Sequence, residues 1–129
     1  MIKIYTDGAV NPHSKNTAIG ILIVRNGQQF QYKYSIKQTN NHEAEFQAAI
    51  KGFEKLQELH PKPDEIVFFY SDSKIVIESL EKGYAKHFQA DVDLILKQQS
   101  YYQNVVNNWI ADSDNKGAHN LALQALHQD

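Results

Sequence analysis

The dipeptide Asn26-Gly27 constrains the fold of this chain more than any other feature of its sequence. Asn-Gly between two apolar runs is a strong signal for a two-residue β-hairpin, because both residues tolerate the positive φ angles of that turn. Residues 18–24 before it are apolar, and in residues 28–37 aromatic and aliphatic residues alternate with polar ones. With a short strand-like segment at residues 1–5, the first 37 residues predict a three-stranded antiparallel meander.

Two further dipeptides are turn signals between the first and second strands. Asp7-Gly8 and Asn11-Pro12 are both pairs that turns favour. We therefore expect the first strand to end before Asp7, with this carboxylate just beyond it.

After residue 39 the apolar pattern changes to helical spacing. Ala44, Ala48, Phe53 and Leu56 recur with the period of a helix, and a Thr or Asn before them can cap it. The elements expected beyond this helix are a strand at 65–70, a helix that stops near Gly83, a helix at about 88–102, a strand at 105–110 and a helix at 116–126. The predicted order is βββαβααβα, which is an α/β fold.

Composition limits the class of protein. At 129 residues the chain has the usual size of one compact domain, and we expect residues 1–129 to form a single domain. No apolar run approaches the roughly 18 residues that a membrane span needs, so we expect no membrane contact. The sequence has no cysteine and begins with a strand-like segment rather than a cleavable leader, from which we expect a cytoplasmic protein.

The charge balance argues against a nucleic-acid partner without excluding one. Thirteen Lys and Arg against fifteen Asp and Glu give a formal net charge of -2, which is unfavourable for neutralising many phosphates. A carboxylate cluster becomes less negative, however, once it binds metal ions.

Three acidic residues lie beside apolar segments, at positions where packing of the core does not require a carboxylate. Asp7 is expected after an apolar strand, Glu45 in the first turns of a helix, and Asp72 at the carboxyl end of the most apolar strand, where α/β sheets form their sites. Phosphodiester hydrolysis by two metal ions needs several carboxylates that converge on two cations about 4 Å apart. Each residue alone also fits a structural role: a turn, a solvated helix position and a helix cap, respectively.

Four motifs, in order along the chain, resemble those of type 1 ribonuclease H. They are Tyr-Thr-Asp-Gly-Ala at residues 5–9, Thr-Asn-Asn-His-Glu-Ala-Glu-Phe-Gln-Ala at 39–48, Tyr-Ser-Asp-Ser-Lys-Ile-Val at 70–76, and Trp-Ile at 109–110 followed by Asn-Lys-Gly-Ala at 115–118 and Leu-Ala at 121–122. The resemblance covers nearly the whole chain. It implies a ribonuclease H-like fold, with a mixed five-stranded sheet of three antiparallel and then two parallel strands flanked by helices.

The resemblance also implies an activity. It is that of an endonuclease that hydrolyses the RNA strand of RNA/DNA hybrids by two-metal-ion catalysis, with Mg²⁺ or Mn²⁺ as cofactor and two ions per site. The hybrid is then the expected partner.

Carried over by position, Asp7 and Asp72 resemble the family's strand-borne metal ligands and Glu45 its helix-borne carboxylate. Glu43 is the alternative for the helix position, although the Ala-Glu-Phe context at residues 44–46 favours Glu45. Where the family has a fourth carboxylate on its last helix, this chain has His119. His119 is either a catalytic metal ligand that biases the site toward Mn²⁺, because imidazole suits transition metals better than Mg²⁺, or a surface or capping residue.

Two acidic residues of the preceding loop, Asp112 and Asp114, could compensate for the missing carboxylate. Either residue is an alternative to His119 as the fourth metal ligand.

Substrate contacts are assigned by resemblance to Asn11, Asn40 and Asn41. Amide side chains suit recognition of the 2'-hydroxyl, although turn and helix-cap roles are the alternative. Two departures from the family pattern weigh on this assignment. The loop at residues 7–20 lacks a Gly-Asn-Pro-Gly sequence and brings Asn11 earlier, and the Thr-Asn-Asn motif is one residue farther from Glu45.

The basic helical protrusion of some family members has no counterpart at residues 82–87. This predicts weak, salt-sensitive hybrid binding unless a partner domain contributes. Tyr84, Lys86 and His87 could contact a phosphate of the DNA strand. The aromatic residues of the strand patterns are expected in the core or on sheet faces instead: Tyr32, Tyr34, Phe68, Phe69 and Trp109.

Two other functions stay open at this point. One is a nucleic-acid-binding or regulatory module that keeps the fold but has lost efficient catalysis, which His119 and the missing protrusion favour. The other is a related metal nuclease that acts on DNA or on structured RNA.

Overall fold

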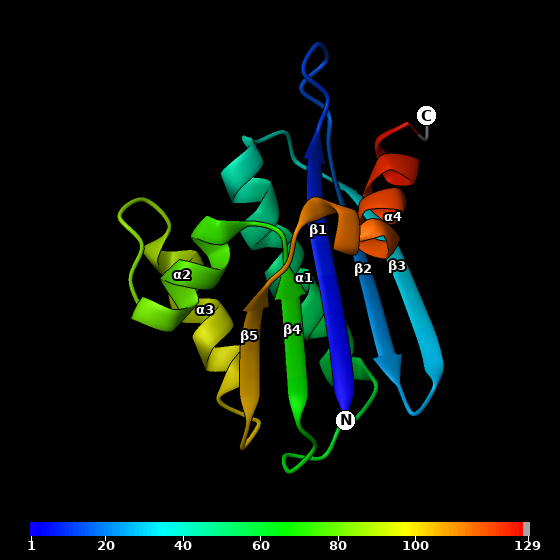
Figure 1. The fold of residues 1–129 in the computed structure, drawn as a ribbon. Coiled ribbons are helices and arrows are strands. Elements are labelled where there is room, and N and C mark those ends of the chain that lie inside the picture. The colour runs from blue at the N-terminus through cyan, green and yellow to red at the C-terminus, as the bar shows by residue number, and fades with distance from the viewer. Residues whose placement is uncertain (128–129) are drawn as a thin grey trace.

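The computed structural model describes residues 1–127, which form a five-stranded sheet with helices on both faces (Figure 1). The antiparallel meander consists of β1 (Ile2–Val10), β2 (Thr17–Arg25) and β3 (Gln28–Ile36). Two strands parallel to β1 extend it, β4 (Val67–Ser71) and β5 (Val105–Trp109), in the order β3-β2-β1-β4-β5. The mixed sheet predicted from the sequence is confirmed.

Helices connect the strands in the predicted order. They are α1 (Asn41–Glu58), α2 (Lys74–Lys82), α3 (Gln89–Gln99), the 3-10 helix η1 (Asp112–Asp114) and α4 (Lys116–Leu126). Helices α1, α2 and α3 gather on one face of the sheet, whereas α4 lies on the opposite face across β1, β2 and β3 (Figure 1). No helix of residues 1–127 is long and apolar enough to cross a membrane.

Strand β2 is the centre of the core because α1 covers one of its faces and α4 the other. Residues 17–21 are accordingly all buried, rather than alternately buried and exposed. Where α4 crosses β2, a Cβ on Gly20 would lie 2.1 Å from the carbonyl oxygen of Ala118, so only glycine permits this approach. The close contact fixes the position of α4 on the sheet.

The predicted turn at Asp7-Gly8 is wrong. Strand β1 continues to Val10, with Asp7 paired to Gly20 in the antiparallel ladder with β2. The chain reverses instead after Asn11, whose backbone N–H donates to the Asn16 carbonyl at 2.8 Å. The hairpin predicted at residues 26–27 is present, with φ angles of 52° and 76°.

Most of the strand aromatics lie where the sequence predicts. Phe69 is buried, and Tyr32 and Tyr34 pack against the core from β3. Of the two positions expected for Trp109, the core is wrong, because this residue ends the edge strand β5 and is 46% exposed.

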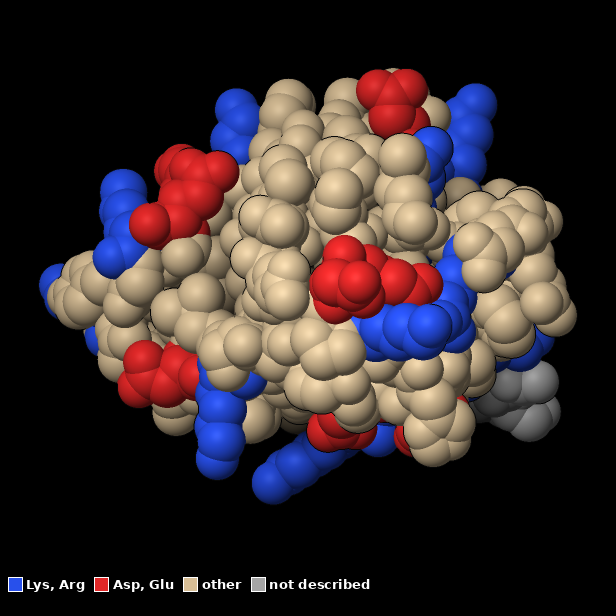
Figure 2. Space-filling model, turned by 90° about the horizontal axis from the view of Figure 1, so that it is seen from below, with Lys and Arg blue, Asp and Glu red and all other residues tan. Residues whose placement is uncertain are grey.

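Charges of both signs are mixed on the end of the molecule at which β1 begins. Figure 2 shows this end, where Lys and Arg side chains are interspersed with Asp and Glu side chains. The formal charge of -2 therefore does not produce an acidic face at this end.

Candidate metal centre

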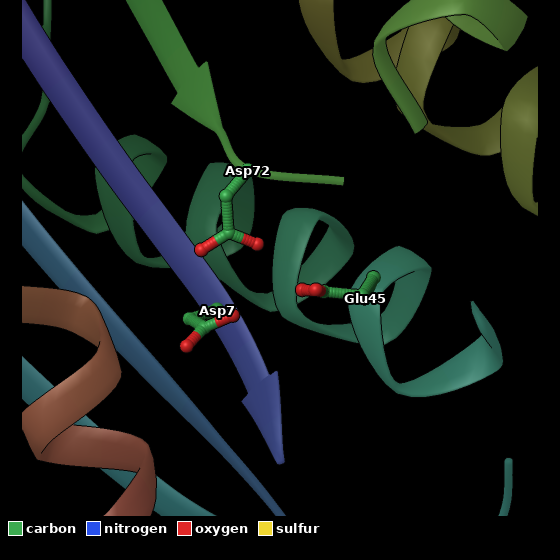
Figure 3. A group of neighbouring side chains, drawn as sticks. All are labelled: Asp7, Glu45 and Asp72. Carbon is green, nitrogen blue, oxygen red and sulfur yellow. The ribbon is translucent and has the colours of Figure 1, made fainter. Parts of the chain in front are cut away.

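Three carboxylates from three elements meet at the opposite end of the sheet. Asp7 lies in β1, Glu45 near the start of α1, and Asp72 directly after β4. Their side chains point toward one another (Figure 3), and one oxygen of each lies within 4.8 Å of the other two. The cluster forms because β1 and β4 are adjacent parallel strands and α1 packs over β1.

A backbone N–H of β1 holds the side chain of Glu45. The Gly8 N–H donates to Oε1 of Glu45 at 2.9 Å. A Cβ on Gly8 would lie 2.8 Å from the carbonyl carbon of Ala44, which shows how closely α1 approaches the strand here.

Asp72 is held at both its backbone and its side chain. The indole Nε1 of Trp109 donates to the Asp72 carbonyl at 2.9 Å. The amide Nδ2 of Asn115 donates to Oδ2 of the Asp72 carboxylate at 3.1 Å. Both contacts come from segments that lie far along the chain from Asp72.

Burial and crowding of the carboxylates disfavour their ionised forms. Burial, followed by the nearby Asp7 and Asp72, raises the pKa of Glu45 to about 10. Burial, followed by Asp72, raises the pKa of Asp7 to about 6, although the hydrogen bond with His119 lowers it. A divalent cation would remove this repulsion, and carboxylate oxygens are the ligands that Mg²⁺ and Mn²⁺ prefer. The donor set therefore fits such a metal.

His119 stands beside the cluster on α4. Its Nδ1 lies 2.8 Å from Oδ2 of Asp7, and its side chain is half exposed. The last helix thus brings an imidazole, rather than a carboxylate, to Asp7.

The alternative acidic residues differ in where they lie. Glu43 accepts a hydrogen bond from Gln47 at 2.7 Å and is outside the three-carboxylate cluster. Asp112 lines the same cavity as Glu45 and Asp72, of about 800 Å³. Asp114 lines a different cavity, under the start of α4.

The three asparagines are in three different settings. Oδ1 of Asn40 accepts from the Glu43 N–H at 2.8 Å and caps α1, and Oδ1 of Asn11 accepts from the N–H groups of His13 and Ser14 in its own turn. Asn41 is exposed and lines the cavity that contains Glu45 and Asp72. The structure thus places one of the three in the same cavity as two of the carboxylates.

This cavity has side chains of both signs on its walls. Lys74, Lys82 and Lys86 line it together with four carboxylates, and His42, His87 and exposed Tyr84 also line it; the carboxylates are Glu45, Asp72, Glu78 and Asp112. Nζ of Lys74 lies 4.9 Å from the centre of the Trp109 ring.

Sequence reasoning missed Asn115 and Trp109 as residues of this site. Asn115 lies in a motif noted above and has a usual helix-cap residue type, but its side chain makes no capping bond and is 1% exposed. Only the fold shows that both residues reach Asp72.

Comparison with known proteins identifies relatives over the full length of the chain. The sequence profile of the family described as RNase H matches residues 1–127. The Enterococcus faecalis protein named "Putative hydrolase EbsB" is 32% identical over 99% of this chain and 96% of its own length. Ribonuclease H of Trichodesmium erythraeum is 33% identical over 70% of this chain, which spans 54% of that protein. The solved structure of LC11-RNase H1 in complex with RNA/DNA hybrid has a TM-score of 0.87 at 24% identity, covering 98% of this chain and 96% of that one.

Proposed function

The chain belongs to the RNase H family, and we propose that it is a metal-dependent endonuclease that hydrolyses the RNA strand of RNA/DNA hybrids. The observation that carries this proposal is the convergence of Asp7, Glu45 and Asp72 within 4.8 Å. The substrate is supported by LC11-RNase H1, which shares the fold and was solved with an RNA/DNA hybrid.

We propose that Asp7, Glu45 and Asp72 hold Mg²⁺ or Mn²⁺, two ions per site. When bound, such ions activate a water molecule and stabilise the leaving oxygen of the cleaved phosphodiester. The chain supplies the negative charge, and the Gly8 N–H and the Asn115 amide donate hydrogen bonds to Glu45 and Asp72, respectively.

His119 belongs to the proposed site as a partner of Asp7 and as a further catalytic ligand. Its Nδ1 contacts Asp7, but His119 is outside the group of Asp7, Glu45 and Asp72 whose ligand atoms lie within 4.8 Å of one another, so its half-exposed side chain would have to turn toward the cluster to bind an ion. Because imidazole favours Mn²⁺ over Mg²⁺, we expect faster cleavage in Mn²⁺. His119→Asp should restore a carboxylate and raise the ratio of Mg²⁺ to Mn²⁺ activity, and an unchanged ratio would exclude His119 as a metal ligand.

Substrate contacts are proposed along the cavity that contains Glu45 and Asp72. Asn41 would contact the RNA strand there, and Lys86 and His87 a phosphate of the DNA strand. Asn11 and Asn40 stay predictions, with their side-chain oxygens engaged in a turn and a cap.

A substrate panel tests the proposed function. The purified protein is incubated in Mg²⁺ and separately in Mn²⁺ with a labelled RNA/DNA hybrid, single-stranded RNA, duplex RNA and duplex DNA. We expect cleavage of the RNA strand of the hybrid alone. Equal or faster cleavage of another substrate would indicate a different metal nuclease, and hybrid binding without cleavage would indicate a regulatory module.

Two predictions about the whole chain continue as proposals. One continuous sheet supports a single domain, although residues 128–129 lie outside the described part. The other proposal is a cytoplasmic location, which we expect from the sequence and which cell fractionation would test.

A further inference from the structure

We propose that Asn115 is a positioning residue of the metal centre, whose amide holds the Asp72 carboxylate in the orientation that binds a cation. The inference rests on the proposed function, because it concerns how the same site is held. Asn115 is 1% exposed, and it donates from one nitrogen to two acceptors: the Thr6 carbonyl at 2.9 Å and Oδ2 of Asp72 at 3.1 Å.

The two hydrogen bonds fix the amide plane. Thr6 precedes Asp7 in β1, and Asp72 follows β4, so Asn115 joins the two strands that carry these ligands. An amide nitrogen has two N–H donors in one plane, and anchoring the first on a backbone carbonyl directs the second. Asp72 therefore meets a donor whose direction is set by β1.

The position has a cost that a purely structural residue would avoid. Oδ1 of Asn115 is buried and has no hydrogen-bond partner within residues 1–127. An unpaired buried carbonyl destabilises a fold, and an apolar residue of similar size would remove that penalty. The amide is better explained by its nitrogen, which donates to the Thr6 carbonyl and to Asp72 together.

Asp72 needs such a donor because three carboxylates crowd one another at this site. One oxygen of each of Asp7, Glu45 and Asp72 lies within 4.8 Å of the other two, and the orientation of a carboxylate in so crowded a group depends on a fixed donor. Trp109 restrains only the backbone of Asp72, through its carbonyl. Asn115 is the residue outside the cluster that hydrogen-bonds the Asp72 carboxylate within residues 1–127.

Two substitutions separate the donor from the packing. Asn115→Leu keeps most of the side-chain volume and removes both the donor and the unpaired oxygen, whereas Asn115→Ala also leaves a cavity. Asn108→Ala is the matched control, because this half-buried β5 amide donates to the Val106 carbonyl at 3.0 Å and touches no carboxylate of the cluster. Unfolding curves in chelator establish the temperature at which every variant is folded.

Mn²⁺ binding is then measured by titration calorimetry without substrate. We expect both Asn115 variants to bind Mn²⁺ about 10- to 100-fold more weakly than the wild type, and Asn108→Ala to bind unchanged. Hybrid cleavage should lose kcat with little change in KM for the hybrid, and high Mn²⁺ should restore part of it. Wild-type Mn²⁺ affinity in folded Asn115→Leu would overturn the inference.

The outcomes distinguish this inference from the proposed function. A wild type that binds Mn²⁺ more tightly than Asn115→Leu, yet cleaves no hybrid, would uphold the positioning role and refute the proposed activity. A wild type that cleaves the hybrid but binds Mn²⁺ no more tightly than Asn115→Leu would uphold the proposed activity and refute the positioning role.

Discussion

Replacing Glu45 with glutamine should stabilise the metal-free protein. Burial and the nearby Asp7 and Asp72 raise the pKa of Glu45 from its ordinary value of 4.5 to about 10. The folded state therefore binds a proton that the unfolded state releases at neutral pH. Glutamine has nearly the same shape, can still accept the hydrogen bond from Gly8, and carries no charge to desolvate.

The magnitude follows from the linkage of protonation to folding. Because the folded pKa is the higher one, the associated stability is complete below pH 4.5 and is lost as the pH rises toward 10. Each pH unit of that range costs about 1.4 kcal/mol, so by pH 7 the loss is at most about 3.4 kcal/mol. Relaxation of the site and proton sharing with Asp7 reduce it, and we expect a gain of about 1–3 kcal/mol for Glu45→Gln at pH 7.

Urea unfolding in chelator at pH 4.5 and at pH 7 measures this gain. Glu45→Gln should match the wild type at pH 4.5, exceed it at pH 7, and lose its advantage when Mn²⁺ is added, because the wild type binds the ion more tightly. Glu54→Gln, at an exposed position on the same helix, is the control and should show no such gain. A Glu45→Gln protein less stable than the wild type at pH 7 in chelator would refute the reasoning.

Three further predictions test other parts of the structure. Burial and nearby Glu43 raise the pKa of Asp91 from its ordinary value of 3.8 to about 7, so the stability that its neutral form contributes is lost as the pH rises through this range. Asp91→Asn should therefore raise Tm at pH 8 but not at pH 3.5. Equal Tm values of variant and wild type at pH 8 would contradict this. Gly20→Ala places a Cβ 2.1 Å from a carbonyl oxygen of α4 and should lower the free energy of unfolding by about 1–3 kcal/mol, measured in urea. A variant as stable as the wild type would be inconsistent with this packing. The hydrogen bond between His119 and Asp7 lowers the pKa of Asp7, so His119→Ala should raise this pKa above about 6 in an NMR titration of the metal-free protein. A lower pKa of Asp7 in the variant would exclude the hydrogen bond.

The order of the elements could be predicted because each pattern is local. The Asn26-Gly27 turn, the helical spacing from residue 44 and the apolar strand before Asp72 depend on neighbours in sequence. Asp7-Gly8 is not the turn that its sequence predicts, for the opposite reason. Its strand conformation depends on pairing with β2, and the glycine fits the close approach of α1, neither of which is local.

The site could be predicted in part. The strand and helix patterns singled out Asp7, Glu45 and Asp72, the resemblance implied their role as metal ligands, and adjacent parallel strands explain why Asp7 and Asp72 meet. The hydrogen bonds from Asn115 and Trp109 to Asp72 could not be predicted, because they span 43 and 37 residues and depend on where η1 and the end of β5 lie. The same holds for the contact of His119 with Asp7, which depends on how closely α4 crosses the sheet.

We propose that the carboxylate cluster catalyses cleavage of RNA in a hybrid. The most direct test compares the initial rates of hybrid cleavage by the wild type and by Asp72→Asn in Mg²⁺ and in Mn²⁺, with circular dichroism to verify that both are folded. We expect RNA cleavage by the wild type and none above background by Asp72→Asn. Equal rates for the two proteins, or no cleavage by a folded wild type in either metal, would contradict it.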